Sequence, residues 1–162
     1  NGRGEFGDGM GFKMSRGGLD SGNVLRFNVA FDNRSHNFTD NGGGALTVYN
    51  NTSFGAGWAG FHVPGSSEVT PSTLTNNISF RDTEGVKVVP TSEGGPGPVS
   101  RNNSWDLGID DPLFVSLDPD DPGFLRLRPD SPAVDAGADV GEAFAGTAPD
   151  LGAYELQSTA ER

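Results

Sequence analysis

The feature that most limits the fold of this chain is an internal repeat of 23 to 26 residues. The segments VLRFNVAFDN, LTVYNNTSFGAG, STLTNNISFRD and PVSRNNSWDL each carry an aromatic residue three positions after an asparagine. The aromatic residues are Phe31, Phe54, Phe80 and Trp105, and the asparagines are Asn28, Asn51, Asn77 and Asn102. Repetition at such a period is typical of solenoids, in which each unit packs only against its neighbours.

A second row of residues keeps the same period. Its members, at spacings of 26, 23 and 25 residues, are Phe12, Phe38, Phe61 and Val86. Each unit has room for two or three short strands separated by Asn or Gly turns, which is the size of one coil of a parallel β-helix. The repeated leucines of leucine-rich repeats are absent. We therefore predict an all-β parallel β-helix of about four to five coils.

Coil stacking assigns structural roles to the residues of the first row. Coils stack at the strand spacing of roughly 4.8 Å, so equivalent residues lie over one another. We predict that Asn28, Asn51, Asn77 and Asn102 form a buried ladder at a turn, in which each amide bonds the next coil. The aromatic row is predicted to stack beside this ladder as core.

The repeat covers residues 1–105, and a Pro- and Asp-rich segment, residues 106–162, follows it. A stack of coils exposes its core and its unpaired strands at each end. We therefore expect residues 106–162 to form a C-terminal cap packed on the same solenoid. The N-terminal residues already belong to a coil, so we expect further coils upstream, or self-association through this uncapped end.

Composition narrows the function classes. Only 33% of the residues are hydrophobic, while 25 are Gly and 11 are Pro, which favours a turn-rich β chain over long buried helices. The net charge of −11 disfavours a nucleic-acid partner, because binding phosphates needs a basic face. The chain has no cysteine for a disulfide or a thiolate metal site. No apolar run approaches the length of a membrane span, so no membrane partner is expected.

The stretch GDGMGFKMS, residues 7–15, contains the main candidate for chemistry, Lys13. Alternation along a strand places Phe12 and Met14 on one face and Lys13 on the other. In the register of the second row, the outward positions that follow Lys13 are Thr39, His62 and Lys87. A polar outward row along a β-helix is a natural groove for an extended polymer.

Other familiar sites do not fit the sequence. The glycines of GDGMGF do not have the spacing of a dinucleotide-binding loop, and GFKMS lacks the Gly-Lys-Ser/Thr order of a phosphate-binding loop. The run DPDDPG has no distal glutamate for a calcium loop of the EF-hand type. The two histidines, His36 and His62, stand in no catalytic motif.

Two segments resemble one enzyme family. GDGMGFKMSRGG and the following NVLRFNVAFDNRSHNFTDNGGGALTVYNNTSF are similar to coils of polysaccharide lyase family 9, the pectate lyases with a right-handed parallel β-helix. The similarity covers residues 7 to about 105, and the family pattern there reads GDGNGFKLGG. The ending SPAVDAGADVG with PDLGAYE resembles the C-terminal cap of many secreted bacterial β-helix proteins.

The resemblance implies a calcium-dependent, secreted, extracellular lyase that acts on an acidic polysaccharide, pectate (polygalacturonate), by β-elimination. The lysine of the GFK motif, the Brønsted base of the family, corresponds to Lys13. Arg16 and His62 are candidates for contacting substrate. The family's calcium ligands lie on coils before the GFK motif, so we expect the Ca²⁺ ligands upstream of this chain. The insertion in KMSRGG, where the family has KLGG, enlarges the turn beside the base.

Two alternatives remain open from the sequence. The chain can be a non-catalytic β-helix that binds or supports carbohydrate, with Trp58 and Tyr49 as candidate stacking residues. It can also be a lyase for another uronate polymer, such as alginate.

Overall fold

A computed structural model describes residues 7–14, 22–40, 45–64, 70–89 and 97–157. Arg16, a predicted substrate contact, lies outside the described residues. The regular structure within them consists of short β-strands, and no described segment forms a helix that could cross a membrane. The strands are β1 (Phe12–Met14), β2 (Val24–Arg26), β3 (Val29–Phe31), β4 (Phe38–Asp40), β5 (Thr47–Tyr49), β6 (Thr52–Phe54), β7 (Phe61–Pro64), β8 (Thr73–Thr75), β9 (Ile78–Phe80), β10 (Val86–Val89) and β11 (Val99–Arg101).

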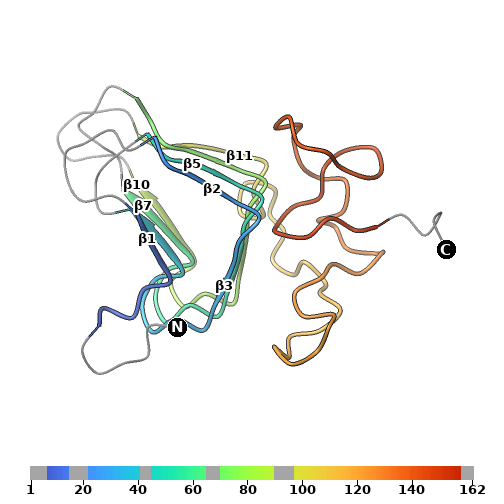
Figure 1. Ribbon diagram of the computed structural model, residues 1–162, viewed down its shortest axis with the longest axis horizontal. Coiled ribbons are helices and arrows are strands. Elements are labelled where there is room, and N and C mark those ends of the chain that lie inside the picture. Colours follow the sequence, from blue (N-terminus) through green and yellow to red (C-terminus); the bar gives the residue numbers. More distant parts are fainter. Residues whose placement is uncertain (1–6, 15–21, 41–44, 65–69, 90–96, 158–162) are drawn as a thin grey trace.

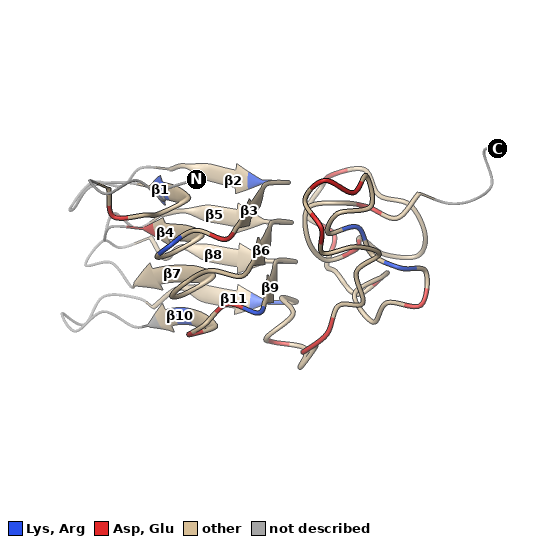
Figure 2. Cartoon of the chain, turned by 90° about the horizontal axis from the view of Figure 1, so that it is seen from below, with Lys and Arg blue, Asp and Glu red and all other residues tan. Residues whose placement is uncertain are grey.

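The strands form three parallel sheets. The first sheet has the order β1-β4-β7-β10, the second β2-β5-β8-β11 and the third β3-β6-β9. The chain passes through the three sheets in turn and then returns to the first, so it makes three full coils and a fourth that contributes β10 and β11. Figure 1 shows the sheets around a common interior, and Figure 2 shows the coils stacked on one another. The predicted parallel β-helix is confirmed.

The interior of the coils is filled by residues in register. Phe12, Phe38 and Phe61 lie opposite one another in the first sheet. Their rings stack at centroid distances of 5.1 and 4.8 Å, nearly parallel to one another. Leu25, Val48 and Leu74 of the second sheet pack against this aromatic stack. The inner core is therefore built on the Phe12 row, and not on the Phe31 row that sequence spacing predicted as core.

A ladder of asparagines runs along the turn between the second and third sheets, and all its members except the half-buried Asn28 are buried. The side-chain Nδ2 of Asn28 donates to Oδ1 of Asn51, that of Asn51 to Asn77, and that of Asn77 to Asn103, at 2.8 to 3.0 Å. The backbone N–H of each donor residue bonds the same oxygen. At the end of the ladder, Asn103 donates to a carboxylate oxygen of Asp106 at 2.8 Å.

The fourth rung of the ladder is Asn103, so the prediction of Asn102 is wrong. An asparagine pair occupies three of these turns, and only its second member belongs to the ladder; at the first turn Phe27 precedes Asn28. The first member, Asn50, Asn76 or Asn102, has a left-handed backbone with φ between 50° and 57°. Asn tolerates this conformation better than most residues.

The outward asparagines hold the C-terminal segment, residues 106–157, against the coils. Asn50 Nδ2 donates to the carbonyl of Asp150 at 2.9 Å, and Asn76 exchanges two hydrogen bonds of 2.8 Å with Ala138. Asn102 reaches the carbonyl of Ala136 at 3.4 Å. In each asparagine pair, therefore, one member bonds the neighbouring coil and the other bonds the C-terminal segment.

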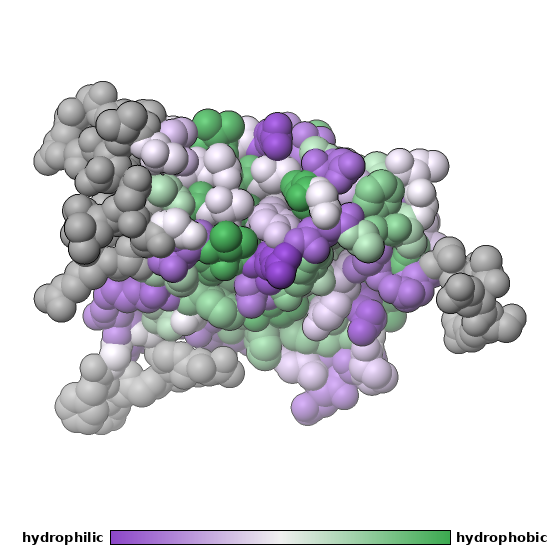
Figure 3. All heavy atoms as spheres, turned by 45° about the horizontal axis from the view of Figure 1, so that its top comes forward, coloured by the Kyte–Doolittle hydropathy of each residue, from purple (hydrophilic) through white to green (hydrophobic). Residues whose placement is uncertain are grey.

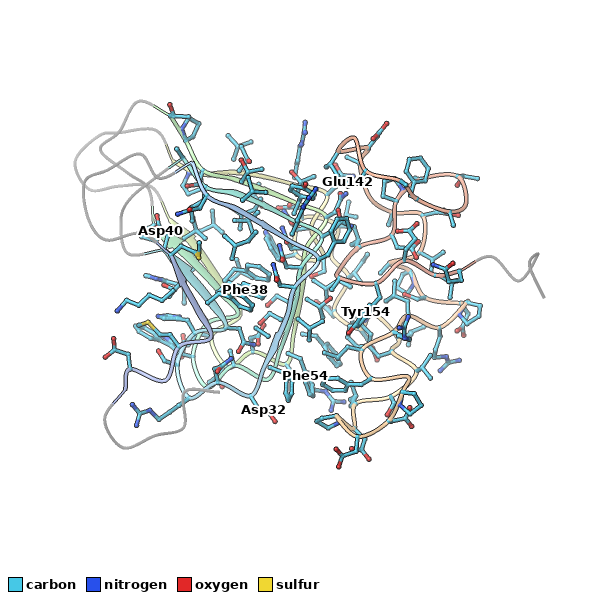
Figure 4. All side chains as sticks on the ribbon, viewed as in Figure 1. Asp32, Phe38, Asp40, Phe54, Glu142 and Tyr154 are labelled. Carbon is cyan, nitrogen blue, oxygen red and sulfur yellow. The ribbon has the colours of Figure 1, made fainter. Side chains whose placement is uncertain are left out.

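The aromatic row of the third sheet lies under the C-terminal segment and not inside the coils. Phe31 and Phe54 contact the ring of Phe124 at 5.0 and 6.2 Å, and Phe80 contacts Phe114 at 5.7 Å. Figure 4 shows Phe38 pointing into the interior and Phe54 pointing toward the C-terminal segment. The segment thus creates a second hydrophobic core with the third sheet. Figure 2 shows the segment beside β3, β6 and β9.

Trp105 departs from the aromatic row in which the sequence placed it. Its ring lies 5.3 Å from that of Phe61 and packs against the inner core, with the indole N–H bonded to Ser100 at 2.9 Å. The turn after Asn103 carries the ring inward, so the spacing rule fails at the last coil.

The second sheet faces solvent over part of its outer side. Arg26 donates to the Tyr49 hydroxyl at 3.2 Å, and Tyr49 donates to Glu142 of the C-terminal segment at 2.7 Å. Figure 3 looks toward this side and shows hydrophobic residues interspersed with hydrophilic ones. Tyr49, a candidate stacking residue, is therefore engaged in joining the two parts of the chain.

We predict that Asn103→Ala lowers the free energy of unfolding by about 3 kcal/mol, because it leaves the buried amide of Asn77 without its acceptor. Asn102→Gly is the matched control. It keeps the left-handed backbone and loses one long hydrogen bond, so the expected loss is below about 1 kcal/mol. Urea unfolding of both variants measures the difference, and equal losses would contradict the assignment of the ladder.

We also predict that Phe124→Ala lowers the free energy of unfolding by about 3 kcal/mol and loosens the C-terminal segment, because the ring fills the space between Phe31 and Phe54. Amide hydrogen exchange should rise in residues 106–157 and stay unchanged in the inner strands. Phe144→Ala, which removes an exposed ring from the same segment, is the control. Unchanged exchange in Phe124→Ala would contradict this view of the second core.

Candidate functional site on the first sheet

Lys13 lies in the middle of β1 with its side chain on the outer face of the first sheet. Phe12 and Met14 pack against the inner core, and strand alternation turns Lys13 the other way. The Nζ of Lys13 donates to a carboxylate oxygen of Asp8 at 3.0 Å, and the two side chains are 43% and 68% exposed. An ion pair this exposed contributes little to stability. Another anion can therefore replace Asp8 beside Lys13.

The predicted outward row is present. Lys13 lies opposite Thr39, Thr39 opposite His62, and His62 opposite Lys87. The row is not uniformly open, because Thr39 is buried and its hydroxyl lies 3.2 Å from Nδ1 of the half-buried His62. Lys87, at the far end, pairs with Glu84 at 3.4 Å.

His62 of this row also belongs to a cluster of three aromatic rings, whose other members are Trp58 and His36. The ring of His36 lies 4.6 Å from that of Trp58 and 4.5 Å from that of His62, at interplanar angles of 26° and 15°. Trp58 and His62 are 6.1 Å apart and nearly parallel. His36 belongs to one coil, and the other two rings belong to the next.

Sequence reasoning missed this cluster. His36 stands two residues before Phe38, Trp58 three before Phe61 and His62 one after it, so no common position in the repeat links them. One sequence signal that could have identified the cluster is that all three residues lie within three positions of Phe38 or Phe61, which are in register in the first sheet.

Both histidines are held neutral at neutral pH. Burial lowers the pKa of His36, and the nearby His62 lowers it further, against a hydrogen bond to the backbone of Ala59. Burial also lowers the pKa of His62, against the opposing field of Asp40. The Nδ1 of His36 is buried without a hydrogen-bond partner among the described residues. The ring cluster therefore presents aromatic surface without positive charge.

The described residues do not fit a metal ion. No three histidine or carboxylate side chains among them converge in a way that could hold one. The calcium that the family resemblance implies accordingly has no ligand set on this part of the chain.

Comparisons with known proteins agree with the fold and with the sequence resemblance. No protein-family model matches the chain. Pectate lyase L of Paenibacillus polymyxa (strain SC2) is 31% identical over 117 residues, which make up 69% of this chain and 25% of that protein. The crystal structure of pectate lyase Pel9A superposes with a TM-score of 0.57 and 26% identity, covering 83% of this chain and 36% of Pel9A.

The chain thus spans about a quarter of the curated relative and about a third of the solved one. Both the sequence similarity and the structural similarity extend over most of this chain. By sequence and by fold, the chain is a pectate-lyase-like, right-handed parallel β-helix that resembles polysaccharide lyase family 9.

Proposed function

We propose that this chain supplies the catalytic base, Lys13, of a lyase that cleaves polygalacturonate by β-elimination. The observation that carries the proposal is the position of Lys13. It lies within the GDGMGFK motif, its side chain is exposed on the outer face of the first sheet, and its described partner is the weakly held Asp8. The likeness to two pectate lyases supports the substrate class.

In the proposed reaction, the amine of Lys13 takes the proton from C5 of a galacturonate residue. The electrons of the C5–H bond form the C4=C5 double bond, and the bond from C4 to the glycosidic oxygen breaks. The departing oxygen takes a proton from water, and the hydroxide left behind takes the proton from Lys13. The products are one unsaturated and one ordinary chain end. A general base at this position contributes roughly 10²- to 10⁴-fold to the rate.

Calcium is part of the proposal through the family resemblance. When bound, it binds the uronate carboxylate and makes C5 more acidic. Because the described residues offer no ligand set, we place its ligands elsewhere in the intact protein and route no step through it. What this chain contributes to binding is the outward row, in which His62 and Lys87 can bond the hydroxyls and carboxylates of a uronate polymer.

The net charge of −11 repels an acidic polymer in general, so binding depends on local cations. The chain's two lysines both lie in the outward row. Polygalacturonate is an extracellular polymer, and we accordingly propose that the protein is secreted.

The two lysines allow a matched test. Lys13→Ala should lower the release of unsaturated uronides from polygalacturonate at least about 100-fold, because it removes the base. Lys87→Ala, at a site of similar exposure in the same row, should keep kcat within roughly threefold and mainly raise KM. Ultraviolet absorbance of the product, with calcium present, follows turnover.

Turnover by Lys13→Ala at the wild-type rate would refute the role of Lys13. Activity on alginate in place of polygalacturonate would refute the substrate assignment, and the absence of unsaturated product from the intact protein, assayed with calcium, would refute the lyase.

A further inference from the structure

The ring of Trp58 is held by stacking contacts with two histidines and yet is left open to solvent. It is 48% exposed, whereas the other tryptophan, Trp105, packs against the inner core. The third-sheet phenylalanines are covered by the C-terminal segment. An exposed indole on a rigid scaffold is a common feature of surfaces that bind apolar faces.

The backbone fixes Trp58 from both neighbouring coils. Its N–H donates to the carbonyl of Ser35 at 3.0 Å, and its carbonyl accepts from Glu84 at 2.9 Å. Gly57, just before it, lies so close to the preceding coil that a Cβ would come within 2.3 Å of the Arg34 carbonyl oxygen. The ring is therefore positioned before any ligand arrives.

His36 supports the ring from the side of the preceding coil. It is 2% exposed and in stacking contact with both Trp58 and His62. Its Nδ1 has no hydrogen-bond partner within the described part of the chain, a cost that a phenylalanine at the same place would avoid. Because the histidines are neutral, Trp58 and His62 together present a flat, uncharged surface at the edge of the outward row.

The surroundings of this surface select the ligand chemistry. A pyranose ring has an apolar face of C–H groups that packs on an indole, and hydroxyls around its edge. The outward row adds a cation on each side of His62. Lys13 lies two strand spacings from His62, and Lys87 lies one spacing away on the other side. An apolar face bordered by cations matches a uronate better than a neutral sugar.

We propose that Trp58 and His62, supported by His36, form a stacking subsite for one uronate ring of a polymer whose reacting ring lies at Lys13. The strand spacing separates the two positions by roughly 10 Å. This subsite rests on the proposed function for its polymer, but its binding does not depend on catalysis.

The test measures binding of trigalacturonate by calorimetry and by tryptophan fluorescence, without requiring turnover. Trp58→Ala should weaken binding about tenfold and remove the fluorescence change, while Trp58→Phe should retain most of the affinity. Phe144→Ala, which removes a similarly exposed ring from the C-terminal segment, is the control and should bind like wild type. Thermal unfolding confirms that each variant is folded.

Equal affinities of wild type and Trp58→Ala would overturn the subsite. A methyl-esterified trigalacturonate that binds as tightly as the free acid would overturn the assignment to uronates. Kinetics separate this proposal from the role of Lys13: loss of the subsite raises KM with kcat retained, whereas loss of the base lowers kcat. Trp58→Ala that lowers kcat at unchanged KM would also contradict the subsite.

Discussion

A buried amide side chain must find hydrogen-bond partners, and in this protein that requirement fixes how the coils stack. Asn51 and Asn77 are fully buried, and each gives and receives bonds along the ladder. A coil displaced by one residue would break several of these bonds at once. The register that the ladder enforces also superposes the phenylalanines inside and aligns Lys13 with Thr39, His62 and Lys87 outside.

The solenoid also depends on a second core that its own coils do not supply. The third sheet turns small and polar residues such as Ser53 inward and phenylalanines outward. Those phenylalanines need a cover, and the C-terminal segment provides it without forming any of the named strands. The first sheet lies away from this cover in Figure 1, which leaves Lys13 and Trp58 open to solvent.

The sequence predicted the features that depend on the spacing of the repeat, and few of those that depend on which side of a sheet a residue faces. Repeated spacing identified the coils, the Phe12 row and the alignment of Lys13 with His62, because parallel stacking transmits spacing directly into space. It placed the Phe31 row inside the coils, although this row faces outward, since alternation defines two faces but does not orient them. It also chose Asn102 over Asn103, because Asn102 stands three residues before Trp105, and Trp105 leaves the aromatic row. The ring cluster of Trp58 escaped because its members come from different positions of the turn and the strand.

The carboxylate at the end of the ladder gives the stack a polarity. Every described rung donates toward the following coil, so the amide dipoles point the same way and reinforce one another. Their combined positive end falls at Asn103, where Asp106 places a negative charge, much as an anion meets the N-terminus of an α-helix. A carboxylate has no N–H with which to pass the array on. The same residue that neutralises the array therefore also ends it.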